Sequence, residues 1–342
     1  SGDSNLITPS EATFIHLDWL EGVLPTPDGQ PPKAIQFEGG LYNSLVLFNN
    51  GEVHYSGYNA NNSAGDNTTT VANSYVRCGY ARTNKAGTSV LRGKKAIRIA
   101  STAGGDTNAN AANYALIENA DGTREIWAWG YNGYGQLGDG TTVAKAVPTK
   151  ITTALNGKIV EIWATGGDYG QLYVLTDTGY MYSCGYNGYG QLGLNDTVAR
   201  SSLVQVKVWG TGTSRVKKFV CGGGASASSL FVQQENGSLW SWGYNNYGQL
   251  GHGHTYDIWA PLQVYTNGYT GSTGNNVIGT PSGSAITDCW DVWATGPQNV
   301  CSSYISRGSA VNSTTAYAAG YNGYYNLSDT TTTNRSVYTC LL

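Results

Sequence analysis

The hydrophobic and polar positions of the chain form a short pattern that recurs five times. Each copy holds several short apolar runs, and some of these alternate between apolar and polar residues. Alternation of this kind has the period of a half-buried β-strand and not that of a helix. It is clearest in residues 125–129 and 238–242, where tryptophan stands at every second position. The pattern therefore predicts a chain of short strands.

Each copy predicts four strands separated by turns. The first apolar run ends at glycine and covers residues 35–40, 97–105, 159–167, 216–223 and 290–296. The second run covers residues 45–48, 114–117, 172–175, 230–232 and 303–305. In the first four copies a turn rich in Asn, Asp and Gly joins this run to the third, which indicates a hairpin. The fourth run, at residues 147–151, 261–264 and 336–340, often contains proline, which places that strand at a sheet edge.

A ten-residue motif follows the third run of each copy. It reads Trp-Gly-Tyr-Asn-Gly-Tyr-Gly-Gln-Leu-Gly at residues 129–138 and returns with small changes at residues 184–193 and 242–251. Two degraded copies of the motif occur near the start and the end of the chain. The motif glycines therefore stand at positions 57, 130, 185, 243 and 320, with spacings of 73, 55, 58 and 77 residues. The two long gaps carry insertions near residues 79–87 and 265–284, and neither has room for a further unit. Four strands recurring at this spacing predict a β-propeller with five units.

The motif, together with the glycine pair before it, resembles the regulator of chromosome condensation repeat. The resemblance covers residues 33–342 and implies a propeller, usually of seven blades. Five units depart from that number, so either the ring has five blades or the chain is part of a larger ring or array. The predicted fold class is all-β, a β-propeller of four-stranded blades with an extra N-terminal strand.

Residues 1–32 precede the repeats as an N-terminal extension, and residues 33–342 form the predicted propeller. Within the extension, Ile15, Leu17 and Trp19 alternate with polar residues and predict a half-buried strand, which a proline-rich linker follows. A lone strand needs a sheet to join. It can pair with its own chain or cross to a neighbouring subunit by strand addition.

The low charge of the chain narrows the classes of partner. Charged residues make up 12% of the sequence and the net charge is −3, so we expect no basic surface for nucleic acid. No apolar run approaches the roughly 18 residues of a membrane span. The abundance of Gly, Tyr, Asn and Thr resembles that of secreted or virion-surface proteins, which leads us to expect an extracellular or virion-surface location.

The sequence contains no convincing catalytic motif, so we expect no enzyme, no cofactor and no metal. The six cysteines lack the C-x-x-C spacing of a metal or redox site, and they permit three disulfides without indicating a pairing. His252 and His254 are most simply read as parts of a polar loop. Asp66, Asp139 and Asp329 stand at equivalent positions after the motif glycine and could surround calcium, although aspartate there is also ordinary turn chemistry.

Tyrosine fills the variable positions of the motif and is the strongest candidate for an interaction surface. The remaining motif residues have structural explanations, and Leu137, Leu192 and Leu250 are expected to fill the seams between blades. Repeat symmetry predicts that the tyrosine rings form a circle on one face, where they bind a partner or merely pack between adjacent loops. This predicted binding or assembly surface consists of Tyr58, Tyr131, Tyr134, Tyr186, Tyr189, Tyr244, Tyr247, Tyr321 and Tyr324.

The function expected from these observations is structural and non-enzymatic. The chain would be a subunit of an extracellular or virion-surface assembly, such as a filament, an appendage or a phage tail or decoration, formed with copies of itself. The alternative is a monomeric secreted module that recognises a glycan or a surface protein through the tyrosine loops. The resemblance also implies a nucleotide-exchange factor, but the charged surfaces expected of one have no counterpart in this composition.

Overall fold

The computed structural model describes residues 29, 32–40, 42–79, 90–91, 93–102, 110–206, 215–222, 224, 227–295, 301–308 and 315–341. Over these ranges the chain forms five four-stranded antiparallel sheets and one two-stranded hairpin, with no α-helix. Each four-stranded sheet is built from strands that are consecutive in the sequence. The all-β prediction is confirmed. The predicted strand with Ile15, Leu17 and Trp19 lies outside the described residues.

We number the four-stranded sheets as blades 1 to 5 in chain order. Blade 1 contains β1 (Ala34–Gly39), β2 (Asn43–Phe48), β3 (Val53–Gly57) and β4 (Ala72–Arg77). Blade 2 contains β5 (Lys95–Ser101), β6 (Ala112–Glu118), β7 (Arg124–Gly130) and β8 (Lys145–Lys150). Blade 3 contains β9 (Ile159–Thr165), β10 (Gln171–Thr176), β11 (Met181–Gly185) and β12 (Arg200–Gln205), with a 3-10 turn, η1 (Gly167–Tyr169), between its first two strands. Blade 4 contains β13 (Val216–Gly222), β14 (Ser229–Gln234), β15 (Leu239–Gly243) and β16 (Ile258–Gln263), and blade 5 contains β19 (Cys289–Thr295), β20 (Ser302–Arg307), β21 (Thr315–Gly320) and β22 (Arg335–Cys340).

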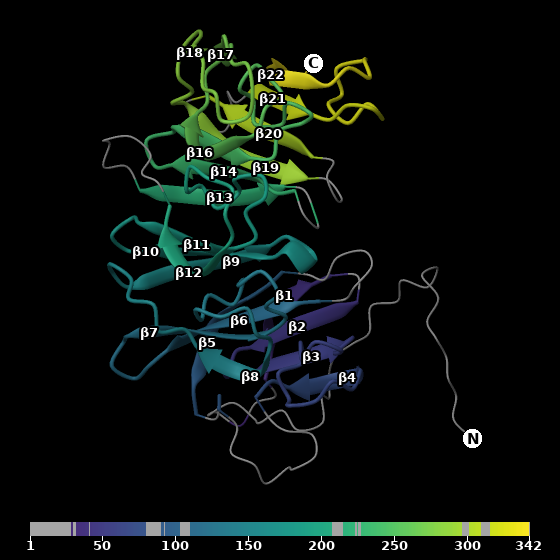
Figure 1. Cartoon of the computed structure of the whole chain (residues 1–342), viewed down its shortest axis with the longest axis vertical. Coiled ribbons are helices and arrows are strands. Elements are labelled where there is room, and N and C mark those ends of the chain that lie inside the picture. The colour runs from purple at the N-terminus through teal and green to yellow at the C-terminus, as the bar shows by residue number, and fades with distance from the viewer. Residues whose placement is uncertain are drawn as a thin grey trace, which may run out of the picture.

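Blades 2 to 5 follow one another along the long axis of the molecule, and blade 1 lies beside blade 2 (Figure 1). Their first strands lie side by side: β5 contacts β1 on one side and β9 on the other, and β13 contacts β19. Blades 1 and 5 lie at opposite ends of this succession (Figure 1). The described blades therefore form an open array, and not the closed ring that a complete propeller would have.

The fourth strands and the second insertion match their predictions from sequence. The proline-containing strands β8 and β16 are edge strands, where a missing backbone N–H leaves no hydrogen bond unmade. The insertion at residues 265–284 forms the small hairpin of β17 (Tyr269–Thr270) and β18 (Thr280–Pro281), which supplies no blade of its own. The other insertion, near residues 79–87, lies almost entirely outside the described residues.

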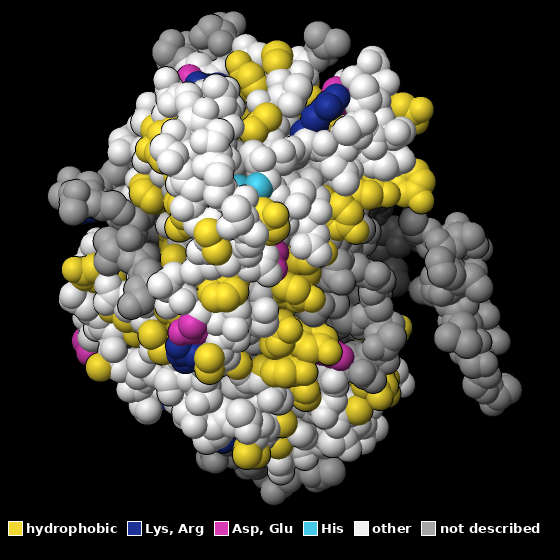
Figure 2. Space-filling model, turned by 45° about the horizontal axis from the view of Figure 1, so that its top comes forward, with side chains coloured by type: hydrophobic (Ala, Val, Ile, Leu, Met, Phe, Trp, Pro, Cys, Tyr) yellow, Lys and Arg dark blue, Asp and Glu magenta, His cyan; other side chains and the backbone are white. Residues whose placement is uncertain are grey.

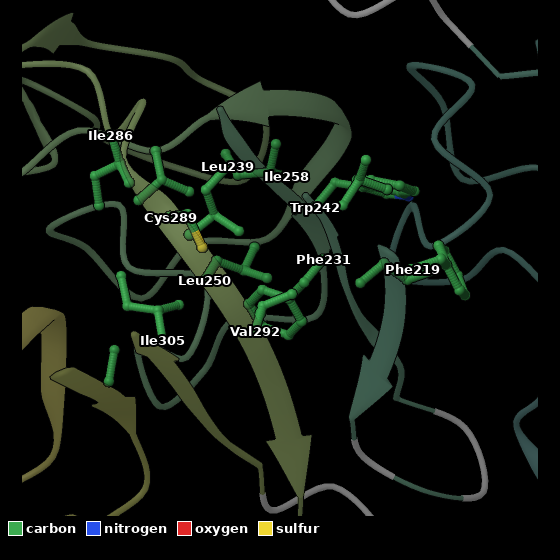
Figure 3. Packing of buried hydrophobic residues seen from close by; sticks show 14 of the residues in the cluster. Phe219, Phe231, Leu239, Trp242, Leu250, Ile258, Ile286, Cys289, Val292 and Ile305 are labelled. Atoms are coloured by element: carbon green, nitrogen blue, oxygen red, sulfur yellow. The ribbon is translucent and has the colours of Figure 1, made fainter. Parts of the chain in front are cut away.

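The hydrophobic clusters lie between neighbouring blades. Leu45 of blade 1 packs in one cluster with Trp129 of blade 2, and a second cluster joins blades 2 and 3. A third cluster continues through blades 3, 4 and 5, and Figure 3 shows Phe231 of β14 facing Val292 of β19. Because inner blades bury both faces in this way, all residues of β10 and β14 are buried.

Candidate functional site

The motif loops lie directly after the third strand of each blade. We use this name for the motif glycine and the nine residues that follow it, residues 57–66, 130–139, 185–194, 243–252 and 320–329. The motif glycines have positive φ angles, from 93° at Gly130 to 120° at Gly57, which a residue with a side chain rarely adopts. Each loop therefore turns sharply away from its strand in the same way, so a given position of the motif has the same place in each of the five loops.

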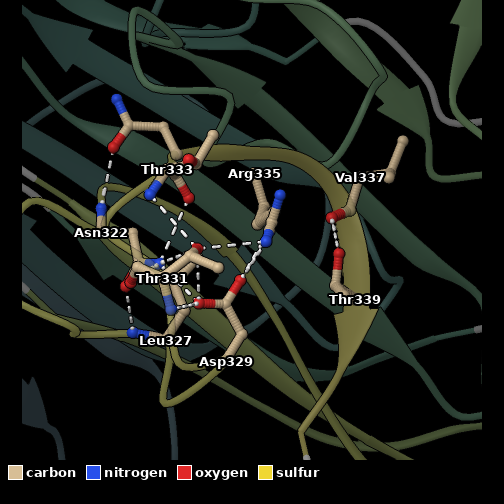
Figure 4. Close-up of polar contacts among 9 residues, drawn as sticks. Asn322, Leu327, Asp329, Thr331, Thr333, Arg335, Val337 and Thr339 are labelled. Atoms are coloured by element: carbon tan, nitrogen blue, oxygen red, sulfur yellow. Dashed lines mark hydrogen bonds and ion pairs between the residues drawn. The ribbon is translucent and has the colours of Figure 1, made fainter.

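A buried asparagine organises each motif loop. In blade 5 the side-chain amide of Asn322 donates to the backbone oxygens of Thr331 and Thr333, at 2.8 and 3.2 Å (Figure 4). Its amide oxygen accepts the backbone N–H of Leu327 at 2.8 Å. The same three contacts recur in the other blades, at residues five, nine and eleven positions after Asn59, Asn132, Asn187 and Asn245. The motif asparagine is thus a structural residue that satisfies backbone groups inside the loop.

The motif glutamine is structural as well. Gln136 is fully buried, and its amide oxygen accepts the backbone N–H of Tyr134 at 2.9 Å. Its amide nitrogen donates to the backbone oxygen of Asp168 in blade 3 at 3.2 Å. The first contact holds the loop in shape, and the second connects it to the next blade.

Each motif loop is clamped onto the blade that follows it. The indole nitrogen of Trp129 in blade 2 donates to the backbone oxygen of Ser63 in the preceding loop, at 3.0 Å. Trp242 of blade 4 makes the same bond with Gln191 of blade 3, at 2.9 Å. The leucines Leu137, Leu192 and Leu250 are fully buried, and Leu137 lies in the cluster between blades 2 and 3. The prediction that the motif seals the seams between blades is therefore confirmed at these loops.

The motif tyrosines of blades 2 to 5 form a row that crosses three blade boundaries. Ring centroids lie 5.2 Å apart between Tyr134 and Tyr186, and 5.0 Å apart between Tyr189 and Tyr244. The row continues from Tyr247 to Tyr321 at 5.1 Å. Most of these pairs meet edge to face, which is a favoured geometry for aromatic rings. Because the array is open, the tyrosines form this row and not the circle expected from repeat symmetry.

The tyrosines differ strongly in accessibility. Tyr244 is buried, Tyr131, Tyr186 and most of the others are partly buried, and Tyr324 at the end of the row is 82% exposed. Tyr58 of blade 1 is exposed. The rings thus pack between adjacent loops and still leave an aromatic edge at the surface.

The tyrosine row is an uncharged surface at neutral pH. Partial burial and the neighbouring hydroxyl of Tyr169 raise the pKa of Tyr134 to about 12, and burial also raises the pKa of Tyr186. Figure 2 shows that the few charged side chains on the face in view are scattered among polar and apolar ones. Such a surface suits stacking and hydrogen bonding with an uncharged partner.

Tyr169 belongs to the row although it lies outside the motif. Its ring stands 5.0 Å from that of Tyr134 and 4.8 Å from that of Tyr186, and the turn η1 places it there. The sequence offered one signal for it, since Tyr169 comes two residues after the glycine pair, Gly166 and Gly167, that ends the first apolar run of this copy. Tyr325, which is exposed beside Tyr324, was also missed, because it occupies a position where three other copies have glycine.

The aspartates considered for calcium do not meet at one site. Burial opposes ionisation of Asp139, but Lys145, at 2.9 Å, and the Thr141 hydroxyl outweigh it and lower the pKa of the carboxyl group. Asp329 is paired in the same way with Arg335, at 2.6 Å. Over the described ranges, no group of three or more His, Cys, Asp or Glu side chains gathers as a metal site would require. These aspartates serve the turns of their own loops.

His252 is a buried loop residue. Its Nε2 lies 3.0 Å from the hydroxyl of Ser241, both side chains are fully buried, and burial lowers the pKa of His252 to about 3. The Ser241 hydroxyl also donates to the backbone oxygen of Leu250. A serine–histidine pair enclosed in this way is part of the packing, because no substrate can reach it.

A groove of about 620 Å³ lies at the opposite end of the strands, between blades 2 and 3. Most of the charged side chains that line it lie in ion pairs: Lys150 contacts Glu125 at 2.8 Å, and Arg124 contacts Glu118 at 3.1 Å. Asp121, whose carboxylate accepts hydrogen bonds from Thr123, also lines the groove. Because these charges are mixed in sign and mostly paired, the tyrosine row remains the better candidate surface.

All six cysteines are free thiols in the structure. Cys184 and Cys301 are fully buried, and burial raises the pKa of both, to about 12 for Cys301. A thiol with so high a pKa stays protonated and reacts slowly. The cysteines thus act mainly as small apolar side chains between the blades.

The molecule is thus built from four-stranded blades, and a recurring loop of one blade packs against the next blade. These features define a repeat protein of the propeller class. Residues 125–170, 178–228 and 236–287 each match the regulator of chromosome condensation (RCC1) repeat. In these three stretches the chain carries RCC1-like repeats. None of its described residues forms a helix long and apolar enough to cross a membrane.

Several known proteins share these repeats. The ultraviolet-B receptor UVR8 of Arabidopsis thaliana is 34% identical over 175 residues, which is 51% of this chain and 36% of the receptor. Protein RCC2 of Mus musculus is 35% identical over 144 residues, 42% of this chain and 25% of RCC2. The chain thus spans about a third or less of the length of these two relatives.

Solved structures agree on the fold. Human WBSCR16 superposes with a TM-score of 0.59 at 18% identity, covering 94% of this chain and 70% of WBSCR16. Prp20p of Saccharomyces cerevisiae, whose structure was described with its binding to Gsp1p and histones, superposes with a TM-score of 0.57 at 17% identity, covering 91% of this chain and 64% of Prp20p. At such identities the likeness shows the architecture alone.

Proposed function

We propose that this chain is a non-enzymatic structural subunit that assembles with copies of itself on an extracellular or virion surface. The observation that carries the proposal is the exposure of aromatic side chains at both ends of the open array. Phe37 of blade 1 and Trp293 of blade 5 are about half exposed, although Ile162 and Phe219, which correspond to Phe37 in inner blades, are buried against a neighbouring blade. Large aromatic residues left in solvent are typical of surfaces that bind another protein.

One further feature is in keeping with a non-enzymatic role, and a second is compatible with a location outside the cell. The candidate serine–histidine pair, Ser241 and His252, is enclosed in the protein. Buried cysteines such as Cys301 resist oxidation, so the fold is compatible with an oxidising environment although it contains no disulfide.

The native mass tests this proposal directly. Light scattering after size exclusion should show species larger than the 36.3 kDa chain, in a proportion that rises with protein concentration. Electron microscopy of the largest fraction should show ordered particles. A single species of monomer mass at every concentration would rule out self-assembly.

The tyrosine row supports a second candidate function, the capture of a glycan or a surface protein. The supporting observation is the uncharged aromatic edge that ends at Tyr324 and Tyr325. Because Tyr324 is exposed, Tyr324→Ala should leave the fold intact and lower binding in a glycan and protein screen. Tyr244→Ala is unsuitable for this purpose, since Tyr244 is buried and its loss would disturb the packing.

A further inference from the structure

Cross-strand pairing aligns the first strands of the five blades and identifies one position that faces the preceding blade. In blade 2 this residue is Ile99, which packs in the cluster shared with blade 1. Its counterparts in blades 3, 4 and 5 are Ile162, Phe219 and Val292. All four side chains are at most 7% exposed. The counterpart in blade 1 is Phe37, which is 55% exposed because no described blade precedes it.

The next residue of each first strand faces the following blade. In blade 3 this residue is Trp163, whose ring centroid lies 4.8 Å from that of Phe219 in blade 4. Its counterpart in blade 5 is Trp293, within the matching sequence Val292-Trp293-Ala294-Thr295. Trp293 is 46% exposed, and Lys218 lies over its ring at 5.0 Å. Blade 5 thus carries a tryptophan at the position that Trp163 occupies at the boundary between blades 3 and 4. In the described structure no blade packs over this tryptophan of blade 5.

The two ends of the array are therefore complementary. The face of blade 1 presents a phenylalanine where blade 4 presents Phe219, and the face of blade 5 presents a tryptophan where blade 3 presents Trp163.

We propose that copies of this chain associate head to tail, with Trp293 of one copy packed on Phe37 of the next. This inference rests on the proposed self-assembly and names the surfaces and the polarity. The contact repeats the Trp163–Phe219 pair that the chain already uses between its own blades. Because the two surfaces differ, the association is heterologous, and it forms a filament or a closed ring of subunits rather than a two-fold dimer.

The contact is confined to the inner strands of the end blades. On the face of blade 1, Val46 is paired with Phe37 across the sheet but is already buried. At the other end, Tyr325 occupies the loop position at which Gly135 lies against the next blade. A bulky residue there holds the outer strands of a neighbour away. The interface is accordingly smaller than a boundary between blades of one chain, and its occupancy should depend on concentration.

Single-face variants test the polarity. Phe37→Asp removes one surface and Trp293→Asp the other, and both side chains are exposed enough for the fold to survive. Each variant alone should remain monomeric in light scattering, because every contact needs one intact copy of each surface. An equimolar mixture should form a species of twice the monomer mass and stop there, since the complementary intact surfaces can make one contact only. Val143→Asp, at an exposed position away from both ends, should assemble as the unmodified chain does.

The outcomes separate this inference from the proposed function. If both single variants assemble like the unmodified chain, the interface lies elsewhere, and self-assembly stands while the head-to-tail contact fails. If the unmodified chain is monomeric at all concentrations, both fail. A monomer in which Phe37→Asp shifts the tryptophan emission to longer wavelength would show that blade 5 closes onto blade 1 of its own chain, which also overturns the proposal. Trp293→Gln provides a second variant should the aspartate disturb Lys218.

Discussion

The motif loops can be tested by adding a single methyl group at Gly135. This glycine has a φ angle of 78° and lies against β12 of the next blade. A β-carbon built on it would stand 2.5 Å from the Cα atom of Ser201. Gly122, in the turn between β6 and β7, has the same φ angle but has nothing within 4 Å of the position where a β-carbon would stand. The pair Gly135→Ala and Gly122→Ala therefore separates backbone strain from a clash between blades.

The expected magnitudes follow from these two terms. A non-glycine residue in the left-handed region costs about 1–2 kcal/mol, and both variants bear this cost. Overpacking at a well-packed contact costs about 1–3 kcal/mol more, and only Gly135→Ala bears it. We therefore expect Gly122→Ala to lower the free energy of unfolding by about 1–2 kcal/mol and Gly135→Ala by about 2–5 kcal/mol.

Two measurements check this expectation. Urea unfolding followed by circular dichroism gives the difference in stability, with the caution that repeat arrays can unfold in more than one step. Hydrogen exchange gives a local readout at the backbone N–H of Gly140, which donates to the oxygen of Ser201 across the boundary at 2.8 Å. Its protection should fall in Gly135→Ala and persist in Gly122→Ala. Equal destabilisation and equal protection in the two variants would refute the view that glycine is needed at position 135 for contact between blades.

Two further predictions concern buried polar side chains. Asn132→Ala removes the partner of the Leu137 N–H and of two backbone oxygens. The buried Leu137 N–H alone should then cost about 1–3 kcal/mol in equilibrium unfolding, and the two partly buried oxygens add to this. A loss no larger than that of an exposed asparagine would contradict the structural role. Burial lowers the pKa of His252 from 6.5 to about 3, so the unfolded chain takes up a proton that the folded chain refuses. Stability should therefore fall as the pH decreases below 6.5, by up to about 1.4 kcal/mol per pH unit from this residue. Burial raises the pKa of Asp257 to about 6, so this residue acts in the opposite direction. The pH dependence of the unmodified chain is therefore compared with that of His252→Gln, which should lose less stability on acidification. Parallel pH profiles of the two proteins would contradict the assignment to His252.

The strands and their order were predictable because their signals are local. Two-residue periodicity, turn residues and edge prolines act over a few positions, and they place β6, β7 and β8 close to their observed bounds. The role of the motif asparagine was predictable in kind, since asparagine often bonds nearby backbone. Its partners were not, because the oxygens that bond Asn132 lie nine and eleven residues later and are brought back by the fold of the loop.

The arrangement of the blades and the tyrosine row depend on long-range packing. The sequence predicts five equivalent loops, and the prediction that their tyrosines form a circle rests on repeat symmetry alone. The angle between successive blades depends on side chains such as Trp163 and Phe219, and the described blades do not close. Tyr169 joins the row from outside the motif, so the complete set of rings was visible only in three dimensions.

The degraded motif of blade 5 keeps the shape of the loop without three of its glycines. Three loop positions that carry glycine in blades 2 and 4 hold Tyr325, Ser328 and Thr330, at φ angles of 60°, 51° and 63°. Each costs about 1–2 kcal/mol in backbone strain, so the loop shape is retained although glycine would hold it at lower energy. A β-carbon on Gly135 would stand 2.5 Å from the Cα atom of Ser201, whereas blade 1 holds Asn62 at the equivalent position, at a φ angle of 62°, with blade 2 beyond it. The fit at this position therefore differs from one blade boundary to the next, and blade 5, with no described blade over it, carries the bulkiest side chain there, the exposed Tyr325.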